Sequence, residues 1–511
     1  MRKIQFLLCF GIFAFLFCSC DLPGGSDGGG SVVIDNPTNV QPRKFWAQNL
    51  KTESFYQVDA VLLAESPNCR VWAERGAGVS TAMATAMARE YEDNILPKML
   101  NTFSYNGPIG FNGMEIGPIA NIKDGMVIAN NTMELAGRLV GGDGKLAILL
   151  LDIVDGFKPR ENEMYCAGYF WAANFYENNP SHQYLKYSNE SSMIYIDIYP
   201  GNPGSVESCT TFAHELQHLM SFVNAFISNK KYTLDTWIDE GLSSAAEWLY
   251  LGEQVKSKVN DYNSDISGLI QKGNNFFVWD NRGSESQYAV LDDYSTVYLF
   301  FQWLRLQSGN TKIYNEITLS KNHDYTAVSE AADKAMGGNG YADWETLLKT
   351  WLAANYINAP TGPYGYRNDG TLKNIRAKTM PAGIKNILLA PGEGVYSITN
   401  NYNLPENRLN IHYTALNKAG NTISDSDTYS GGALLTFNAN SNIEGKTEGG
   451  TTTGVASYAE AYNDAPGRSA LGASFSGPFA IGAQDMLRRN GFDNGPFLDL
   501  PRLKKGTALF E

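Results

Sequence analysis

Two of the five histidines in this chain lie four positions apart, in the segment TFAHELQHLMSF at residues 211–222. On an α-helix, residues i and i+4 share one face, so the imidazoles of His214 and His218 can converge on one metal ion. Glu215 follows the first histidine directly, and in the H-E-x-x-H arrangement this glutamate takes the proton of a zinc-bound water. The alternative is chance placement on an amphipathic helix. Because histidine is rare in this chain, we favour a zinc site.

The motif alone leaves the third metal ligand open. The extended form H-E-x-x-H-x-x-G-x-x-H is excluded, because Ser221 and Asn224 stand where it has glycine and histidine. The remaining histidines are His323 in a loop-like segment, and His182 and His412, which are typical of a loop and a strand surface. We therefore expect a carboxylate to complete the site, since catalytic zinc takes three protein ligands and leaves one position to water.

The segment WIDEGLSSAAEW supplies that carboxylate. Glu240 lies 22 residues after His218, which leaves room for a loop and a returning helix. Asp239 and Asp235 are competitors for the same role. Glu240 is favoured because Gly241 beside it permits close helix packing.

The elements that must position these residues follow from the apolar periodicity. Strand-like runs occur within residues 54–74, 145–156, 165–172 and 193–200, and helical spacing occurs over 78–103. Ser205 is expected to cap a helix that carries both histidines and runs to about residue 228. A second helix is expected at 235–251, and helical patterns continue to about residue 357. This order predicts an α+β fold with a mixed sheet lobe followed by a helical lobe.

The N-terminus resembles a bacterial lipoprotein signal. The segment MRKIQFLLCFGIFAFLFCSC has two basic residues and then an apolar run too short for a comfortable membrane span. Cys20 would be the lipidated residue, with Ser19 before the cleavage site. Phe17 and Cys18 depart from the usual small-residue pattern, so ordinary secretion and a retained anchor remain as alternatives.

We divide the chain into five segments on these grounds. The signal is followed by a stretch rich in glycine and serine, and the last third contains clusters of glycine, asparagine and threonine between short apolar runs. The segments are a signal peptide (1–19), a flexible tether (20–44), an N-terminal α+β lobe (45–204), a helical lobe with the H-E-x-x-H motif (205–360) and a β-rich C-terminal module (361–511).

Composition excludes several other classes of protein. A net charge of −13 and a pI near 5.0 argue against nucleic-acid binding and against a basic membrane-binding surface. After Cys20, the cysteines are Cys69, Cys166 and Cys209, so at most one disulfide can form in the folded region and a four-cysteine zinc site is excluded. Calcium stays undecided, because no acidic segment matches an EF-hand loop.

The two motifs together resemble a known family. TFAHELQHLMSF followed by WIDEGLSSAAEWLY is similar to the gluzincin metallopeptidases and, more closely, to the hyicolysin-type secreted bacterial metallopeptidases. The upstream segments LLAESPNCRVWAE, KLAILLLDIVDG, AGYFWA and MIYIDIYP also look similar, so the resemblance covers roughly residues 55–360.

The resemblance implies a two-lobed zincin-like fold and zinc-dependent endopeptidase activity on proteins or peptides. His214, His218 and Glu240 would bind one zinc ion, and Glu215 would be the general base. The family also implies that AGYFWA is a sheet edge along which a substrate peptide adds a strand. From the residues themselves we favour a core strand for this segment.

Two further residues are candidates for supporting roles. Glu247 lies seven positions after Glu240 on the same helix face, where it can accept a hydrogen bond from a ligand histidine; the alternative is a solvent-facing glutamate. Peptide hydrolysis also requires a donor to the oxyanion, and Tyr294, flanked by polar residues, is the candidate. Tyr298 and His323 compete for this role, although Tyr298 lies in an apolar run that is typical of a core.

Three functions remain to be compared. The first is a lipid-anchored zinc endopeptidase. The second is a non-catalytic surface binding lipoprotein, an adhesin or receptor, that uses the β-rich C-terminal region. Glu215 favours the enzyme, because metal binding alone does not need that residue. The third is an exopeptidase, for which no motif supplies an anchor for the substrate amino terminus.

Overall fold

The computed structural model describes most of the chain between residues 32 and 441. The described stretches are 32–103 (without Asn39 and Glu53), 145–158, 164–181, 184–227, 234–273, 289–380, 388–389, 391–398, 401–403, 410–425, 428–430 and 432–441, with Phe277 and the short strands at 459–460 and 503–505. The predicted signal peptide, Cys20, His182 and much of segment 361–511 lie outside the described residues.

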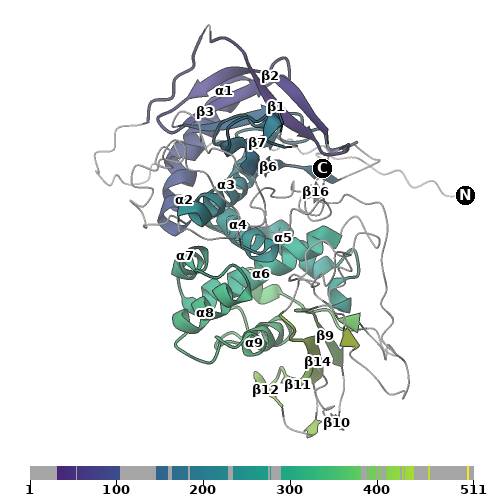
Figure 1. The fold of residues 1–511 in the computed structure, drawn as a ribbon. Helices are drawn as coiled ribbons and strands as arrows, with labels where there is room; N and C mark the ends of the chain where they lie inside the picture. Colours follow the sequence, from purple (N-terminus) through teal and green to yellow (C-terminus); the bar gives the residue numbers. More distant parts are fainter. Residues whose placement is uncertain are drawn as a thin grey trace, which may run out of the picture.

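A mixed six-stranded sheet forms the first lobe (Figure 1). Its strands, in spatial order, are β1 (Arg43–Asn49), β2 (Ser54–Glu65), β3 (Cys69–Glu74), β4 (Leu146–Leu151), β7 (Met193–Asp197) and β6 (Gly168–Phe170). The pairs β3–β4 and β4–β7 are parallel, and the other neighbours are antiparallel. Every residue of β4 and β7 is buried, as expected for central strands covered on both faces.

Part of the predicted tether is packed on this sheet. Asp35 exchanges two backbone hydrogen bonds of 2.8 Å with Glu65 of β2, and β1 begins at Arg43. These two hydrogen bonds connect the chain at Asp35 to the end of β2.

One helical stretch, interrupted by a π-helical turn, packs on β2 and β3 through its first helix. Helix α1 (Thr81–Glu90) begins at Ser80, whose side chain accepts the amide of Met83 at 3.2 Å. The π-helical turn (Tyr91–Ile95) connects it to α2 (Leu96–Phe103), so the helix predicted over 78–103 is confirmed from Thr81 onward, apart from this turn.

Two long helices follow the sheet. Helix α3 (Val206–Ile227) packs on β6 and β7, and α4 (Thr236–Leu251) packs on α3. Ser205 caps α3, because its hydroxyl oxygen accepts the amide of Ser208 at 3.2 Å, as the sequence predicts. Gly252 ends α4 in a left-handed conformation with φ of 71°.

Within its described residues, the second lobe contains five more α-helices, and a small antiparallel sheet lies at its far end (Figure 1). The helices are α5 (Lys256–Ser264), α6 (Ala289–Ser308), α7 (Lys312–Leu319), α8 (Tyr325–Ala335) and α9 (Trp344–Ile357). The sheet has the order β12 (Thr422–Ser424), β11 (Ile411–Asn417), β14 (Ala433–Asn438), β9 (Gly394–Ile398). The fold is thus α+β, as predicted.

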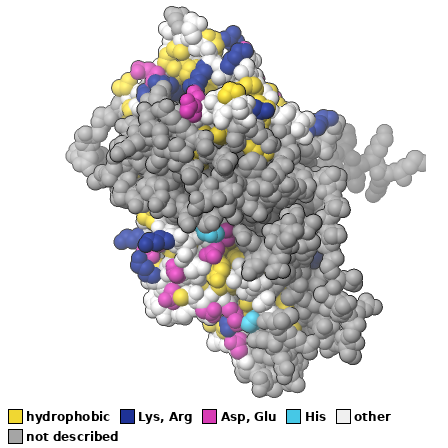
Figure 2. Space-filling view, in the orientation of Figure 1, with side chains coloured by type: hydrophobic (Ala, Val, Ile, Leu, Met, Phe, Trp, Pro, Cys, Tyr) yellow, Lys and Arg dark blue, Asp and Glu magenta, His cyan; other side chains and the backbone are white. Residues whose placement is uncertain are grey.

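The surface and the helices agree with the composition. On the face drawn in Figure 2, acidic side chains recur over the helical lobe, in keeping with the net charge of −13. Among the described residues, no helix combines the length and apolar character needed to span a bilayer.

Candidate metal centre

Two close contacts bring α3 and α4 to their places. A Cβ on Gly168 of β6 would lie 2.9 Å from the Thr211 methyl, so this glycine lets α3 approach the sheet edge. A Cβ on Gly241 would lie 2.2 Å from the Phe301 ring, so this glycine lets α6 pack directly on α4. The close packing expected at Gly241 is therefore present, and its partner is α6.

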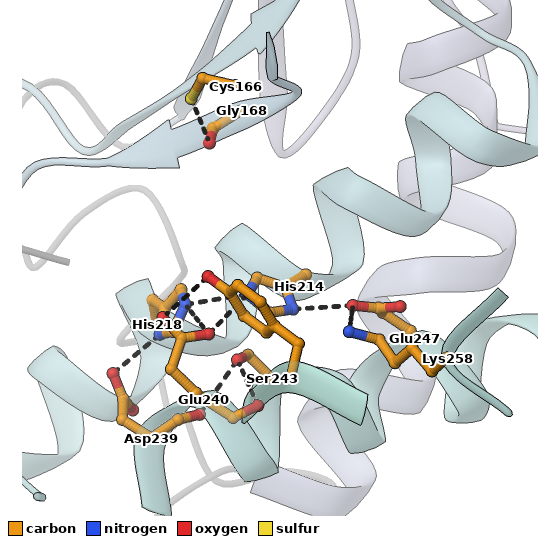
Figure 3. A network of polar contacts seen from close by, with 10 residues as sticks. Cys166, Gly168, His214, His218, Asp239, Glu240, Ser243, Glu247 and Lys258 are labelled. Atoms are coloured by element: carbon orange, nitrogen blue, oxygen red, sulfur yellow. Dashed lines mark hydrogen bonds and ion pairs between the residues drawn. The ribbon is translucent and has the colours of Figure 1, made fainter. Parts of the chain in front are cut away.

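The side chains of His214, His218 and Glu240 converge between α3 and α4 (Figure 3). The two Nε2 atoms lie 3.1 Å apart, and Glu240 Oε2 lies 3.2 Å from His214 Nε2 and 3.7 Å from His218 Nε2. All three side chains are at most 2 % exposed. The potential ligand atoms lie within 4.8 Å of one another, so the group suits one metal ion.

A carboxylate holds the other ring nitrogen of each histidine. Glu247 Oε1 lies 2.9 Å from His214 Nδ1, and Asp239 Oδ2 lies 2.7 Å from His218 Nδ1. A carboxylate accepts and does not donate, so this network assigns the proton of each neutral imidazole to Nδ1. Each Nε2 then directs its lone pair at the shared point, which is the tautomer that a metal ligand requires.

The competitors for the third-ligand position have other partners. Asp239 precedes Glu240 in sequence, and its carboxylate contacts His218 Nδ1. Its position next to a predicted metal ligand could have suggested this supporting role. Asp235 precedes α4, and its Oδ1 lies 3.5 Å from His323 Nδ1. His323 is thus paired at the start of α4 and partly exposed.

The two tyrosines of α6 have different environments. Tyr294 is buried, and its hydroxyl lies 3.4 Å from Glu240 Oε1. The Tyr298 hydroxyl lies 2.5 Å from Gln254 Oε1 and accepts the amide of Val255 at 2.9 Å. Tyr294 therefore adjoins the metal group, whereas Tyr298 joins α6 to the start of α5, in agreement with the predicted core position.

Glu215 is fully buried on the same helix as both histidines. Burial raises the pKa of the Cys166 thiol of strand β5 (Met164–Cys166), and the charge of Glu215 raises it further. The thiol donates to the carbonyl of Gly168 at 3.2 Å (Figure 3). Strand β6 is an edge strand whose residues are all buried, so AGYFWA combines the edge and core positions that the sequence left as alternatives.

Sequence reasoning missed one charged residue of this region. Lys258 of α5 is buried, and its Nζ lies 3.4 Å from Glu247 Oε1 and 4.8 Å from the centre of the Tyr294 ring. Burial lowers the pKa of this ammonium to about 8, against the opposing charges of Glu240 and Asp261. No local sequence signal marks Lys258, because the exposed Lys256 two positions earlier on α5 is a residue of the same type.

The fold and this centre fit one class of protein. A buried His/His/Glu group on two adjacent helices that follow a mixed sheet fits a zincin-type metal site. No protein-family model matches the chain. The chain is a distant homologue of the neutral metalloprotease ShpI of Staphylococcus hyicus, with 27 % identity over 281 residues. This match covers 53 % of the chain and 59 % of the relative, so the chain spans less than two thirds of that protein.

Proposed function

We propose that the chain is a zinc-dependent endopeptidase of the hyicolysin type. The observation that carries this proposal is the convergence of His214, His218 and Glu240 beside the buried Glu215. The similarity to a metalloprotease supports it independently. A structural metal site would need no acid at position 215.

Zinc is the proposed ion because of the donor set. Two imidazole nitrogens and one carboxylate oxygen form the three-ligand set typical of catalytic zinc. When bound there, zinc would act as a Lewis acid and bring the pKa of a coordinated water to about 7. Calcium binding stays undecided.

The side chains of the site have separate roles in this proposal. Glu215 accepts the proton of the attacking water and passes it to the leaving amine. Tyr294 donates a hydrogen bond to the oxygen that becomes negative at the scissile carbonyl. Glu247 and Asp239 hold the two imidazoles in the orientation and tautomer that leave Nε2 free to bind metal.

Location and segment boundaries are part of the same proposal. Cys20 would carry a lipid that anchors the protein at the cell envelope, with secretion after cleavage as the alternative. The lobes at 45–204 and 205–360 would form the peptidase, and 361–511 a β-rich module beside it. The support for the anchor is the N-terminal sequence alone.

The test is cleavage of fluorescent casein by the purified full-length protein and its E215Q variant, both shown to hold one zinc ion. We expect E215Q to lose roughly 10²- to 10⁴-fold in rate, the usual contribution of a general base, and to keep its zinc. The variant E207Q is the matched control, since Glu207 is exposed in the first turn of the same helix. Zinc-loaded wild type that is as inert as E215Q on several proteins would favour the binding lipoprotein instead.

A further inference from the structure

Of the lysines and arginines that the structure describes, Lys258 is the one that is buried, with 7 % of its surface exposed. An ammonium removed from water lowers stability unless it is paired. The contacts of Lys258 beside the metal group explain how this buried charge is stabilised and what it does there.

Lys258 shares one carboxylate oxygen of Glu247 with His214. The ammonium of Lys258 and Nδ1 of His214 both approach the same oxygen, Oε1 of Glu247, at 3.4 and 2.9 Å (Figure 3). Two donors on one oxygen restrict the rotation of the carboxylate more than one donor does. The carboxylate is thereby held where its Oε1 contacts His214 Nδ1.

Lys258 also contacts the ring of Tyr294, whose hydroxyl lies beside Glu240. The ammonium lies 4.8 Å from the centre of the Tyr294 ring, within the range of a cation–π interaction. The hydroxyl of that ring lies 3.4 Å from Glu240 Oε1. One cation thus contacts the partners of two different candidate ligands, one on α3 and one on α4.

Helix α5 is itself fixed relative to these partners. The amide of Val255, just before α5, donates to the hydroxyl of Tyr298 at 2.9 Å. Tyr298 lies one turn after Tyr294 on α6. Helix α6 therefore fixes both the start of α5, which carries Lys258, and the Tyr294 ring that the ammonium contacts. Val259 and Tyr262 anchor the rest of α5 in the core.

We propose that Lys258 is a positioning residue of the metal centre, which holds Glu247 against His214 and Tyr294 against Glu240 through one buried ammonium. The inference rests on the proposed metal site and on no particular substrate. It assigns a role in metal binding to a residue that touches neither the metal nor the substrate.

The test compares zinc affinity, measured by competition with a chromophoric chelator, in wild type, K258M, K256M, E247Q and E247Q/K258M. Lys256 is the matched control, because it lies on the same helix with an exposed side chain that pairs with Glu253. We expect K258M to bind zinc about 10- to 100-fold more weakly, the usual effect of a residue that supports a ligand, and K256M to match wild type. The visible spectrum of the cobalt-substituted protein should change in K258M, since it reports ligand geometry without turnover.

The double variant tests the route of the effect. Because Lys258 and Glu247 act on His214 through one shared contact, the loss of zinc affinity in E247Q/K258M should be smaller than the product of the two single losses. This variant also removes both buried charges together, so it serves if K258M fails to fold with an unpaired carboxylate. A folded K258M with the zinc affinity and cobalt spectrum of wild type, or a double variant whose loss equals the product of the two single losses, would overturn the proposal.

The readouts separate this inference from the peptidase proposal. If wild type binds zinc tightly but cleaves no casein, the peptidase proposal is wrong, and the zinc affinities of the variants still decide the role of Lys258. If wild type binds neither zinc nor cobalt, both the peptidase proposal and the role of Lys258 are wrong.

Discussion

Two buried acidic networks in this molecule look alike by burial and differ in what surrounds the carboxylates. In the sheet lobe, Glu92 lies in the π-helical turn and faces the connection between β2 and β3. Its Oε1 accepts the Ser66 hydroxyl at 2.5 Å and the Asn68 amide at 2.8 Å, and its Oε2 accepts the Asn68 side chain at 2.7 Å. Neutral donors thus surround this carboxylate, and no added ion is needed to stabilise it.

The metal centre has the opposite arrangement. Lone-pair atoms of His214, His218 and Glu240 approach one another at 3.1 to 3.7 Å. Acceptor atoms that converge in a buried site raise the free energy unless a cation lies among them. Burial of an acid therefore says little about function, whereas the type of atom facing it distinguishes a structural network from a metal site.

The largest effect is expected from removing a ligand. Zinc at about 1,000 times its Kd should stabilise wild type by about 4 kcal/mol, because it binds the folded state alone. E240A should lose this zinc-dependent gain, and E92Q should keep it. Urea denaturation with and without zinc measures both, and an E240A variant that is still stabilised by zinc would place the metal elsewhere.

The next effect contrasts the two tyrosines on α6. Y294F removes the proposed oxyanion donor and should lower kcat by roughly 10²- to 10³-fold with little change in stability. Y298F leaves the buried amide of Val255 without its acceptor and should cost about 1–3 kcal/mol of stability, with kcat nearly unchanged. Casein kinetics and thermal unfolding of both variants decide between these roles; equal kcat values would exclude Tyr294 from the reaction.

A smaller effect is expected from the carboxylate behind His218. D239N keeps the shape of the side chain and removes the charge that holds the Nδ1 proton, so zinc affinity should fall about 10- to 100-fold. D235N is the control, because Asp235 pairs with His323 at the start of α4. Chelator competition measures the difference, and equal affinities in the two variants would contradict the role given to Asp239.

The smallest effect is expected in the sheet lobe. E92Q replaces an acceptor oxygen by an amide that cannot accept from Asn68 or Ser66, so stability should fall by about 1–3 kcal/mol. Zinc affinity should stay at the wild-type value. A loss of zinc affinity without loss of stability would show that the Glu92 network and the metal centre are coupled, and would contradict a purely structural role for Glu92.

Much of the fold was predictable from local patterns. The apolar runs predicted the strands that became β2, β3, β4 and β7, because a buried strand needs apolar residues on its covered faces. The cap at Ser205 and the helix after it were also predictable, since capping depends on neighbours in sequence. The π-helical turn and the packed end of the tether were not, because each depends on contacts with distant segments.

By itself, the sequence determined that His214 and His218 share one face of a helix, because the spacing of four residues and the pitch of the α-helix leave no other outcome. The tertiary structure decided which carboxylates face that pair. Glu240, Glu247 and Asp239 lie on another helix, and Lys258 and Tyr294 lie on two more. Their convergence depends on how α4, α5 and α6 pack, and packing is set by side chains far apart in sequence, such as Phe301 against Gly241.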